Sequence, residues 1–287
     1  MIFQDDTIRI EEYFDGRPIS IWEMRNKNIY ARFAEMICHY NFNQRAKNEV
    51  QMHSPLDVQK LYFHQVLDKW APSVLERIED MKKELEKAGQ RQHVDVLSSL
   101  QATFLFDGFD SHFRDMVPAA SDTFPAVLCH NDVLANNLLM GRSHNQHLLL
   151  IDYEYTGWNP MAMDLANWVN ECMLDNAYPY GTGSYSYVEN KMDIEEIENM
   201  AKIYMRTYFE NYAETAVKSK YEDSDQFLKT NLAEFVRQIE KCCLLNNLFW
   251  GVLAISILQP GSYAAQGDWN YEYAAHRIKM YEAMKGK

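Results

Sequence analysis

Amphipathic helical patterns alternate with polar loops along most of the chain. The clearest helix is predicted over residues 73–89, where apolar side chains recur at the 3.6-residue period of a helix. Ser73 and Glu76 predict a capping box at its start, and Gly89 predicts its end. Similar periodicity predicts helices over residues 22–40, 57–70, 94–113, 162–174 and 271–284, one from 193 to about 212, and one or two within 232–258.

Strand patterns are fewer and shorter. Residues 7–14 alternate between apolar and polar side chains, and the residues 15–18 that follow predict a turn. Short apolar runs predict further strands over residues 127–129, 138–140 and 147–151. Residues 41–54 are rich in Asn and Gln and predict a loop. The sequence therefore predicts an α+β fold that is mostly helical.

Composition and charge narrow the classes of function. The 287 residues are 47% apolar, so the chain can bury a sizeable core as one large domain or two small ones. The formal net charge of −13 opposes binding to nucleic acid or to an anionic membrane surface. The most apolar window, residues 244–258, falls short of the roughly 20 residues that span a bilayer. We therefore expect no nucleic-acid partner and no membrane insertion.

The five cysteines indicate a reducing compartment. Their number is odd and no Cys-x-x-Cys spacing occurs, so we predict reduced thiols instead of a disulfide framework or a zinc site. The N-terminal residues are acidic and lack the basic and apolar regions of a signal peptide. These features predict a cytoplasmic location.

The segment 127–175 contains the candidate chemistry. His130, Asp132 and Asn137 form the pattern His-x-Asp-x-x-x-x-Asn. Asp152 follows the predicted strand 147–151. Phosphoryl transfer needs such a set, because an enzyme must position a hydroxyl group and neutralise phosphate charge. Asp132 would accept or orient the hydroxyl proton, while Asn137 and Asp152 would hold Mg²⁺ through oxygen atoms. His130 would hold the loop through backbone hydrogen bonds. The simpler alternative is that these residues only shape a turn.

Further residues extend this pattern into longer motifs. They are His130-Asn131-Asp132 with Asn137, Ile151-Asp152-Tyr153-Glu154-Tyr155, Asn159, Asp164-Leu165-Ala166-Asn167, Glu171, Arg9-Ile10-Glu11-Glu12-Tyr13-Phe14, Arg17, Phe249-Trp250-Gly251, Tyr273, Arg277 and Tyr281. With them the chain resembles the choline/ethanolamine kinase family, a branch of the protein-kinase-like fold, over nearly its whole length. The resemblance implies a transferase that uses ATP and Mg²⁺ to phosphorylate the hydroxyl group of an amino alcohol.

The resemblance also implies a division of the chain. Residues 1–14 would be a remnant strand and hinge of the small lobe, and residues 15–287 would be the kinase-like large lobe. Glu12 and Phe14 would belong to the hinge that receives the nucleotide. A kinase of this type also needs a glycine-bearing loop and a strand lysine before the hinge. The first lysine of this sequence is Lys27, which comes after the predicted hinge. We expect the exposed edge of the remnant strand to favour self-association into a homo-oligomer.

The family's ammonium-binding site would here draw on Glu171, Tyr155, Trp250 and Tyr273. Aromatic faces attract an ammonium group by cation–π contacts of roughly 0.5 to 2 kcal/mol each, although core packing is the alternative role of any aromatic side chain. Asp164 would brace the catalytic loop. Leu134, Asn176 and Leu253 depart from the family's choline-directed pattern. They leave the preference between choline and ethanolamine open, with ethanolamine or a relaxed specificity favoured.

Three functions fit this sequence. The first is ATP-dependent phosphorylation of ethanolamine or choline, the entry step of phospholipid head-group synthesis. The second is a catalytically weak or non-catalytic protein that binds an amine and a metal but cannot clamp ATP. The third is a phosphotransferase of the same fold acting on another amine-bearing alcohol, such as an aminoglycoside. The aromatic C-terminal wall favours a small ammonium compound over a polycationic sugar.

Overall fold

Helices make up most of the molecule. The computed structural model describes residues 3–4, 9–10, 13–53, 60–142, 147–176, 185–265 and 268–285. The helices are α1 (Ile21–Met24), α2 (Lys27–Asn41), α3 (Gln44–His53), α4 (Ala71–Lys87), α5 (Arg91–Phe104), α6 (Phe109–Met116), α7 (Met163–Glu171), α8 (Ile194–Asn211), α9 (Thr215–Lys218), α10 (Ser224–Ser256) and α11 (Asp268–Lys285). Shorter turns are the π-helical η1 (Val66–Trp70) and the 3-10 helices η2 (Ala135–Asn137) and η3 (Val188–Asn190).

The strands are short and form small antiparallel sheets. They are β1 (Phe3–Gln4), β2 (Arg9–Ile10), β3 (Gly16–Pro18), β4 (Ala126–Cys129), β5 (Leu138–Gly141), β6 (Leu148–Leu150), β7 (Gly157–Pro160), β8 (Leu174–Asp175) and β9 (Tyr185–Ser186). Together with the helices they confirm the predicted α+β, mostly helical class.

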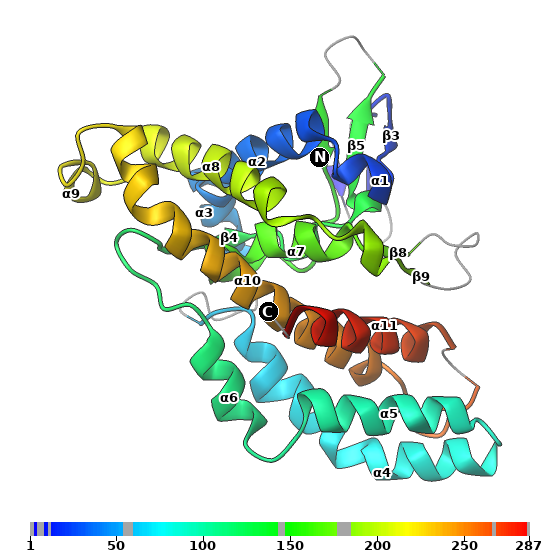
Figure 1. The fold of residues 1–287 in the computed structure, drawn as a ribbon. Helices are drawn as coiled ribbons and strands as arrows, with labels where there is room; N and C mark the ends of the chain where they lie inside the picture. Colours follow the sequence, from blue (N-terminus) through cyan, green and yellow to red (C-terminus); the bar gives the residue numbers. More distant parts are fainter. Residues whose placement is uncertain are drawn as a thin grey trace.

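Helix α10 crosses the middle of the molecule (Figure 1). Its 33 residues extend over about 50 Å. The Asp223 side chain caps its start by accepting a hydrogen bond from the Gln226 amide at 2.8 Å. Residues 245–255 are buried on every face, because α4, α7, α8 and α11 all pack against this helix. A single helix therefore replaces the one or two helices that the sequence predicts within 232–258.

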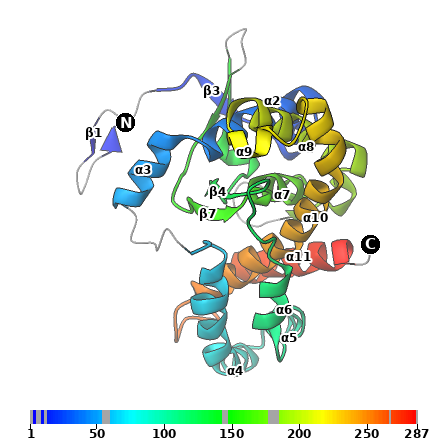
Figure 2. The same cartoon turned by 90° about the vertical axis from the view of Figure 1, so that its left-hand side faces the viewer.

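The other helices cover α10 from two sides. Figure 2 shows α2, α7 and α8 on one side and α4, α5 and α6 on the other. One contiguous hydrophobic cluster joins both groups of helices. The five cysteines are all buried and free of disulfide bonds, as the sequence predicts. None of the described helices is long and apolar enough to cross a bilayer.

Two small sheets position the loops that contain the candidate chemistry. Strands β3, β5 and β6 form one sheet in that order, and β4 pairs with β7 in another. The register places Cys129 opposite Gly157 and Leu138 opposite Leu150. The loop between β4 and β5 therefore begins and ends beside the loop between β6 and β7. The three strands predicted within residues 127–151 are confirmed to within one residue at each end.

The N-terminal predictions need correction. The turn predicted at residues 15–18 is wrong, because Gly16–Pro18 form strand β3 and pair with β5. Only Arg9–Ile10 of the strand predicted over residues 7–14 is a described strand, and it pairs with β1. The division of the chain into a hinge remnant and a large lobe stays a prediction.

Several helices differ from their predicted extents. Residues 41–54, predicted as a loop, contain α3. The helix predicted over 22–40 is divided into α1 and α2, because the Asn26 side chain caps α2 by accepting a backbone N–H at 2.9 Å. The helix predicted over 94–113 breaks at Gly108, whose φ of 84° is left-handed. Capping and backbone conformation, not apolar periodicity, set these boundaries.

The predicted capping box at Ser73 is also wrong. Helix α4 continues directly from η1, and Trp70 at its N-cap makes no side-chain cap. The Ser73 hydroxyl oxygen instead accepts a hydrogen bond from Arg77 Nη2 at 3.2 Å. Gly89 follows the end of the helix with a φ of 74°, as predicted. Part of the helix predicted over 57–70 lies outside the described residues.

Candidate functional site

Two neighbouring loops form the candidate site. Residues 130–137 join β4 to β5, and residues 151–156 join β6 to β7. Past the paired strands, the Ile151 amide donates a hydrogen bond to the Asn137 carbonyl at 3.0 Å, so the loops stay in contact. The strand register therefore brings together Asp132, Asn137 and Asp152, which the sequence predicts as one chemical set.

Each loop contains a residue in the left-handed conformation. Asn131 has a φ of 67° and Asp152 a φ of 68°, and no other non-glycine residue of the described chain has a positive φ. The Asn131 amide nitrogen donates to the Tyr155 carbonyl at 2.8 Å, and its oxygen accepts from Asn159 Nδ2 at 2.7 Å. Such conformations cost energy and cluster at functional sites. Their position in these two loops supports a functional role.

Asp164, near the start of α7, anchors the first loop. Its carboxylate accepts backbone N–H groups from His130 at 3.0 Å and from Asn131 at 2.9 Å. It also accepts a hydrogen bond from Asn41 Nδ2 at 2.8 Å. The Tyr204 hydroxyl holds the Asn41 side chain in place at 2.7 Å. Burial raises the pKa of Asp164, and these hydrogen bonds oppose that shift. The geometry agrees with the bracing role predicted for Asp164.

His130 connects the two loops. Its Nδ1 accepts a hydrogen bond from the Asp132 amide at 3.3 Å, so Nε2 carries the proton and donates to the Ile151 carbonyl at 3.0 Å. Burial lowers the pKa of His130 to about 4. The imidazole is therefore neutral near pH 7, the form that both contacts require. These contacts agree with a structural role.

The Asp132 carboxylate is buried and held by Asn137. Asn137 Nδ2 donates to Asp132 Oδ2 at 2.8 Å and to the Asp132 carbonyl at 3.0 Å. Burial is the main cause that raises the pKa of Asp132 to about 8; the charges of Glu171 and Asp152 act in the same direction, and the Asn137 hydrogen bond opposes them. A cation bound nearby would favour the ionised form. The site is therefore suited to a positively charged ligand.

Asp152 and Asn137 have the side-chain oxygen atoms that could hold a metal ion. Asp152 is exposed, and no described residue donates a hydrogen bond to its carboxylate. Asn137 Nδ2 donates a hydrogen bond to Asp132, so the other polar atom of this side chain, Oδ1, can bind a cation. Among the described residues, no three His, Cys, Asp or Glu side chains gather as a metal site. Mg²⁺ commonly uses one or two protein oxygens together with substrate phosphates and water, so these two ligands fit it.

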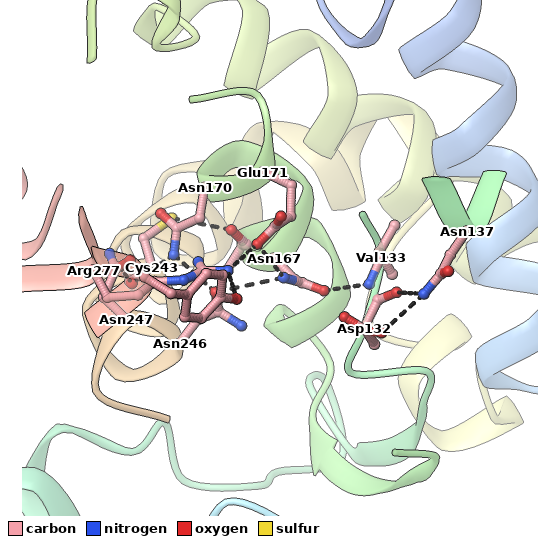
Figure 3. Close-up of polar contacts among 12 residues, drawn as sticks. Asp132, Val133, Asn137, Asn167, Asn170, Glu171, Cys243, Asn246, Asn247 and Arg277 are labelled. Carbon is pink, nitrogen blue, oxygen red and sulfur yellow. Dashed lines mark hydrogen bonds and ion pairs between the residues drawn. The ribbon is translucent and has the colours of Figure 1, made fainter. Parts of the chain in front are cut away.

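A chain of side-chain amides leads from the first loop to a buried ion pair (Figure 3). The Val133 amide donates to Asn167 Oδ1. Asn167 Nδ2 lies 3.5 Å from Glu171 Oε1 and 3.5 Å from Asn246 Oδ1. Asn170 Nδ2 also donates to Asn246 Oδ1, at 3.0 Å. Helices α7 and α10 thus fix the loop on its inner side.

Glu171 and Arg277 form this fully buried ion pair. Arg277 Nη2 donates to Glu171 Oε1, and it donates to the Tyr273 hydroxyl at 2.5 Å. The guanidinium carbon lies 4.8 Å from the Tyr273 ring centre and 6.0 Å from that of Trp250. Burial raises the pKa of Glu171, and Arg277 opposes that shift. Three of the residues predicted to bind an ammonium group therefore already contact an internal cation.

A pocket of about 210 Å³ opens beside the first loop. It is lined by Asp132, Leu134, Glu154, Tyr155, Asn176, Trp250, Leu253, Ala254, Ile257, Trp269 and Tyr273. Tyr155 packs edge to face on Trp250 with ring centres 5.0 Å apart, and Trp269 stacks on Tyr273 at 4.8 Å. The pocket thus contains every predicted substrate residue except Glu171, which lies behind its wall.

The predicted nucleotide hinge is described only in part. Glu12 lies outside the described residues. Phe14 is half-buried, and its ring lies against Gly16 and Gly141 where β3 pairs with β5. Both hinge assignments stay predictions.

Three contributors were missed by reasoning from the sequence. Trp269 lies one helical turn before Tyr273 on α11, a spacing that could have indicated it. Glu154 stands beside the predicted Tyr155 and could have been included with it. Asn41 had no sequence signal, because its contact with the first loop spans distant parts of the chain and its segment resembles a loop.

Solved structures define the class of this molecule. A choline kinase from Cryptosporidium parvum superposes with a TM-score of 0.61 at 19% identity, over 96% of this chain and 69% of that chain. A Plasmodium vivax ethanolamine kinase gives a TM-score of 0.56 at 14% identity, over 95% of this chain and 63% of that chain. The molecule has the protein-kinase-like fold of these proteins.

Sequence comparison defines the family. The choline/ethanolamine kinase family model matches residues 3–282, and the chain belongs to this family. Probable choline kinase 3 of Arabidopsis thaliana is 23% identical over 281 residues, which cover 97% of this chain and 66% of the relative. Ethanolamine kinase 1 of Mus musculus is 30% identical over 161 residues, which cover 56% and 39%. The chain spans about two thirds or less of the length of these relatives.

Proposed function

We propose that this chain phosphorylates the hydroxyl group of ethanolamine or choline, with ATP as the phosphate donor and Mg²⁺ as the metal. One observation carries the proposal: Asp132 belongs to the braced loop and also lines the aromatic pocket. A small amino alcohol can place its ammonium group among the aromatic rings while its hydroxyl group reaches Asp132. Family membership supports the same reaction class.

Asp132 is the proposed general base. In its ionised form it accepts a hydrogen bond from the substrate hydroxyl, orients the oxygen for attack on the phosphate, and takes the proton. The Asn137 amide fixes the carboxylate through its two contacts with Asp132. His130 and Asp164 keep the loop in position, so the carboxylate needs little reorganisation during the reaction.

Asn137 Oδ1 and the Asp152 carboxylate are the proposed metal ligands. These two side chains would hold Mg²⁺, which would supply positive charge to neutralise the phosphate oxygens of the nucleotide. Asp152 has a left-handed conformation and accepts no hydrogen bond from a described residue, which suits a side chain whose partner is a ligand. Glu12 and Phe14 remain the proposed nucleotide hinge.

The ammonium group would lie in the pocket formed by Tyr155, Trp250 and Tyr273. Glu154, and Asp132 in its ionised form, give this pocket negative charge, because Arg277 does not line it. We assign Glu171 an indirect role: it neutralises Arg277, and Arg277 holds the aromatic wall through the Tyr273 hydroxyl.

Asp132→Ala tests this function most directly. We expect transfer of phosphate from ATP to ethanolamine or choline to fall by about 10²- to 10⁴-fold, the usual contribution of a general base. The control is Asp80→Ala on α4, a carboxylate that is 78% exposed, and it should retain the wild-type rate. Equal rates in wild type and Asp132→Ala would contradict the assignment.

The same assay separates the alternatives. Amine binding without any phosphate transfer would support the non-catalytic binding protein and overturn the kinase. Preferential transfer to an aminoglycoside would support the third function, which the small aromatic pocket disfavours. A cytoplasmic location and self-association into a homo-oligomer complete the proposal, and the five free cysteines support the former.

A further inference from the structure

Another pocket lies apart from the aromatic one. Its volume is about 260 Å³, and its walls come from α7, α8, α10, α11 and the two residues 191–192 before α8. Among the described residues, it shares no lining residue with the aromatic pocket. Val169 lines it from α7, the helix that holds the first loop through Asp164 and Asn167. The two pockets are therefore separate sites.

The buried part of this pocket's wall is apolar. Met192 and Ile197 are buried, and Leu244 and Met284 are partly exposed beside them. Ile194 also lines the pocket and is 53% exposed, although isoleucine is among the residues most often buried in folded proteins. An alkyl chain that displaced water from this surface would lower the free energy by the hydrophobic effect. The pocket is thus suited to an apolar chain.

Positive charge surrounds the apolar wall. Among the described lining residues, four are cationic and one is a carboxylate: Lys191, Arg237, Lys241 and Lys285 against Glu240. We call the site lined by these residues the basic pocket. Its local excess of positive charge is opposite in sign to the formal net charge of −13 of the whole chain. The basic pocket therefore favours a negatively charged ligand.

Lys241 is the cation best placed to bind such a ligand. It is exposed and makes no hydrogen bond or ion pair with a described residue. Arg237, four residues earlier on α10, is already paired with Glu234. Leu244 follows Lys241 by three residues, so the two side chains lie next to each other on one face of the helix. A single ligand can therefore reach the ammonium group and the apolar wall together.

An amphipathic anion satisfies both surfaces. Inorganic phosphate would use the cations and leave the apolar wall in water, whereas a neutral hydrocarbon would leave the cations without a partner. At about 30 Å³ per water-sized group, the pocket has room for roughly eight or nine carbon atoms. A membrane surface fits less well, because the net charge of −13 opposes an anionic bilayer.

We infer that the basic pocket binds a free carboxylate with a single alkyl chain, of which decanoate is an example. Its carboxylate would lie beside Lys241, and its chain would lie on Ile194, Ile197 and Leu244. This class of ligand differs from both substrates of the proposed reaction. The inference does not depend on the proposed function, because the two pockets share no lining residue among those that the structure describes.

Isothermal titration of the complete chain with decanoate tests this site. We expect decanoate to bind at millimolar concentration or below. Hexanoate should bind at least about tenfold more weakly, because four fewer methylene groups cover the apolar wall. Acetate, which offers the carboxylate alone, should show no binding at the same concentrations.

Two variants separate the contributions of charge and apolar surface. Lys241→Met keeps an unbranched side chain but removes the ammonium group, so the affinity for decanoate should fall by about threefold, as expected for an exposed ion pair. Ile194→Gln replaces exposed apolar surface and should lower the affinity by about fivefold. Both residues are exposed, so both variants should fold. The control is Lys229→Met, which removes an exposed lysine of α10 outside the basic pocket and should bind decanoate like wild type.

Several results would overturn the inference. They are failure of decanoate to bind at millimolar concentration, equal affinities for hexanoate and decanoate, and an unchanged affinity for decanoate in either Lys241→Met or Ile194→Gln. Sedimentation with phosphatidylglycerol vesicles is the last arm of the test. Binding to these vesicles without binding of free decanoate would assign the basic pocket to a membrane surface instead. None of these outcomes changes the proposed kinase reaction, which is measured with other ligands.

Discussion

Glu171 and Asp152 are carboxylates of neighbouring segments with opposite surroundings. Glu171 is buried and paired with Arg277, which belongs to a distant helix. Asp152 is exposed, has a left-handed backbone, and receives no hydrogen bond from the described residues. A carboxylate in a kinase-like site can therefore either stabilise the fold or remain available to a ligand. The partner of the carboxylate distinguishes these two roles. Its position in a sequence motif does not.

Breaking the buried pair should have the largest effect. Arg277→Met leaves Glu171 buried without a counter-charge, so we expect a loss of about 3 to 5 kcal/mol in the free energy of unfolding. Urea denaturation measures this. The double variant Glu171→Leu with Arg277→Met should recover much of the loss, because no charge is then left in the core. The control Arg237→Met removes an exposed arginine paired with Glu234 and should cost less than about 1 kcal/mol. Equal losses of unfolding free energy in Arg277→Met and Arg237→Met would show that the buried pair contributes no more to the fold than an exposed pair.

Protonation of His130 should produce the next largest effect. Burial lowers its pKa from 6.5 to about 4, so between these values the unfolded chain binds a proton that the folded chain does not. Its contribution to stability is therefore present above pH 6.5 and lost as the pH falls to 4, and it amounts to about 3 kcal/mol.

A pH series of urea denaturations on wild type and His130→Gln isolates this contribution. The stability difference between the two proteins should narrow by about 3 kcal/mol from pH 7 to pH 4, since the variant lacks the imidazole. His147→Gln, which removes an exposed imidazole, is the control. A difference that stays constant across this range would show that His130 is not held in its neutral form.

Neutralising Asp152 should have the smallest effect on stability. Asp152→Asn removes no hydrogen bond or ion pair with a described residue, and Asn also tolerates a left-handed φ, so the free energy of unfolding should change by less than about 0.5 kcal/mol. Binding of Mn²⁺ in the presence of ATP, followed by electron paramagnetic resonance, should weaken at least about tenfold because one carboxylate ligand is lost. Asp107→Asn, an exposed change in the loop between α5 and α6, should leave Mn²⁺ binding unaltered. Large destabilisation with normal Mn²⁺ binding would assign Asp152 to the fold instead.

The sequence predicted most helices and the short strands around the site, but not where several helices begin and end. Apolar periodicity locates the buried face of a helix, as in α4. It does not detect the cap at Asn26, the left-handed Gly108 or the π-helical turn before Ala71. Those boundaries depend on backbone conformations and hydrogen bonds. Many different local sequences can form them, so apolar periodicity does not reveal them.

The sequence by itself determined which side chains could carry the chemistry, because Asp132, Asn137 and Asp152 stand at motif spacings in loops next to apolar strands. Only the tertiary structure decided which of the predicted residues lie together. Strand register brings the two loops together, and the long-range contact of Arg277 withdraws Glu171 from the pocket. Local spacing fixes which atoms are available. The partners of a buried charge come from distant parts of the chain, and folding alone brings them within reach.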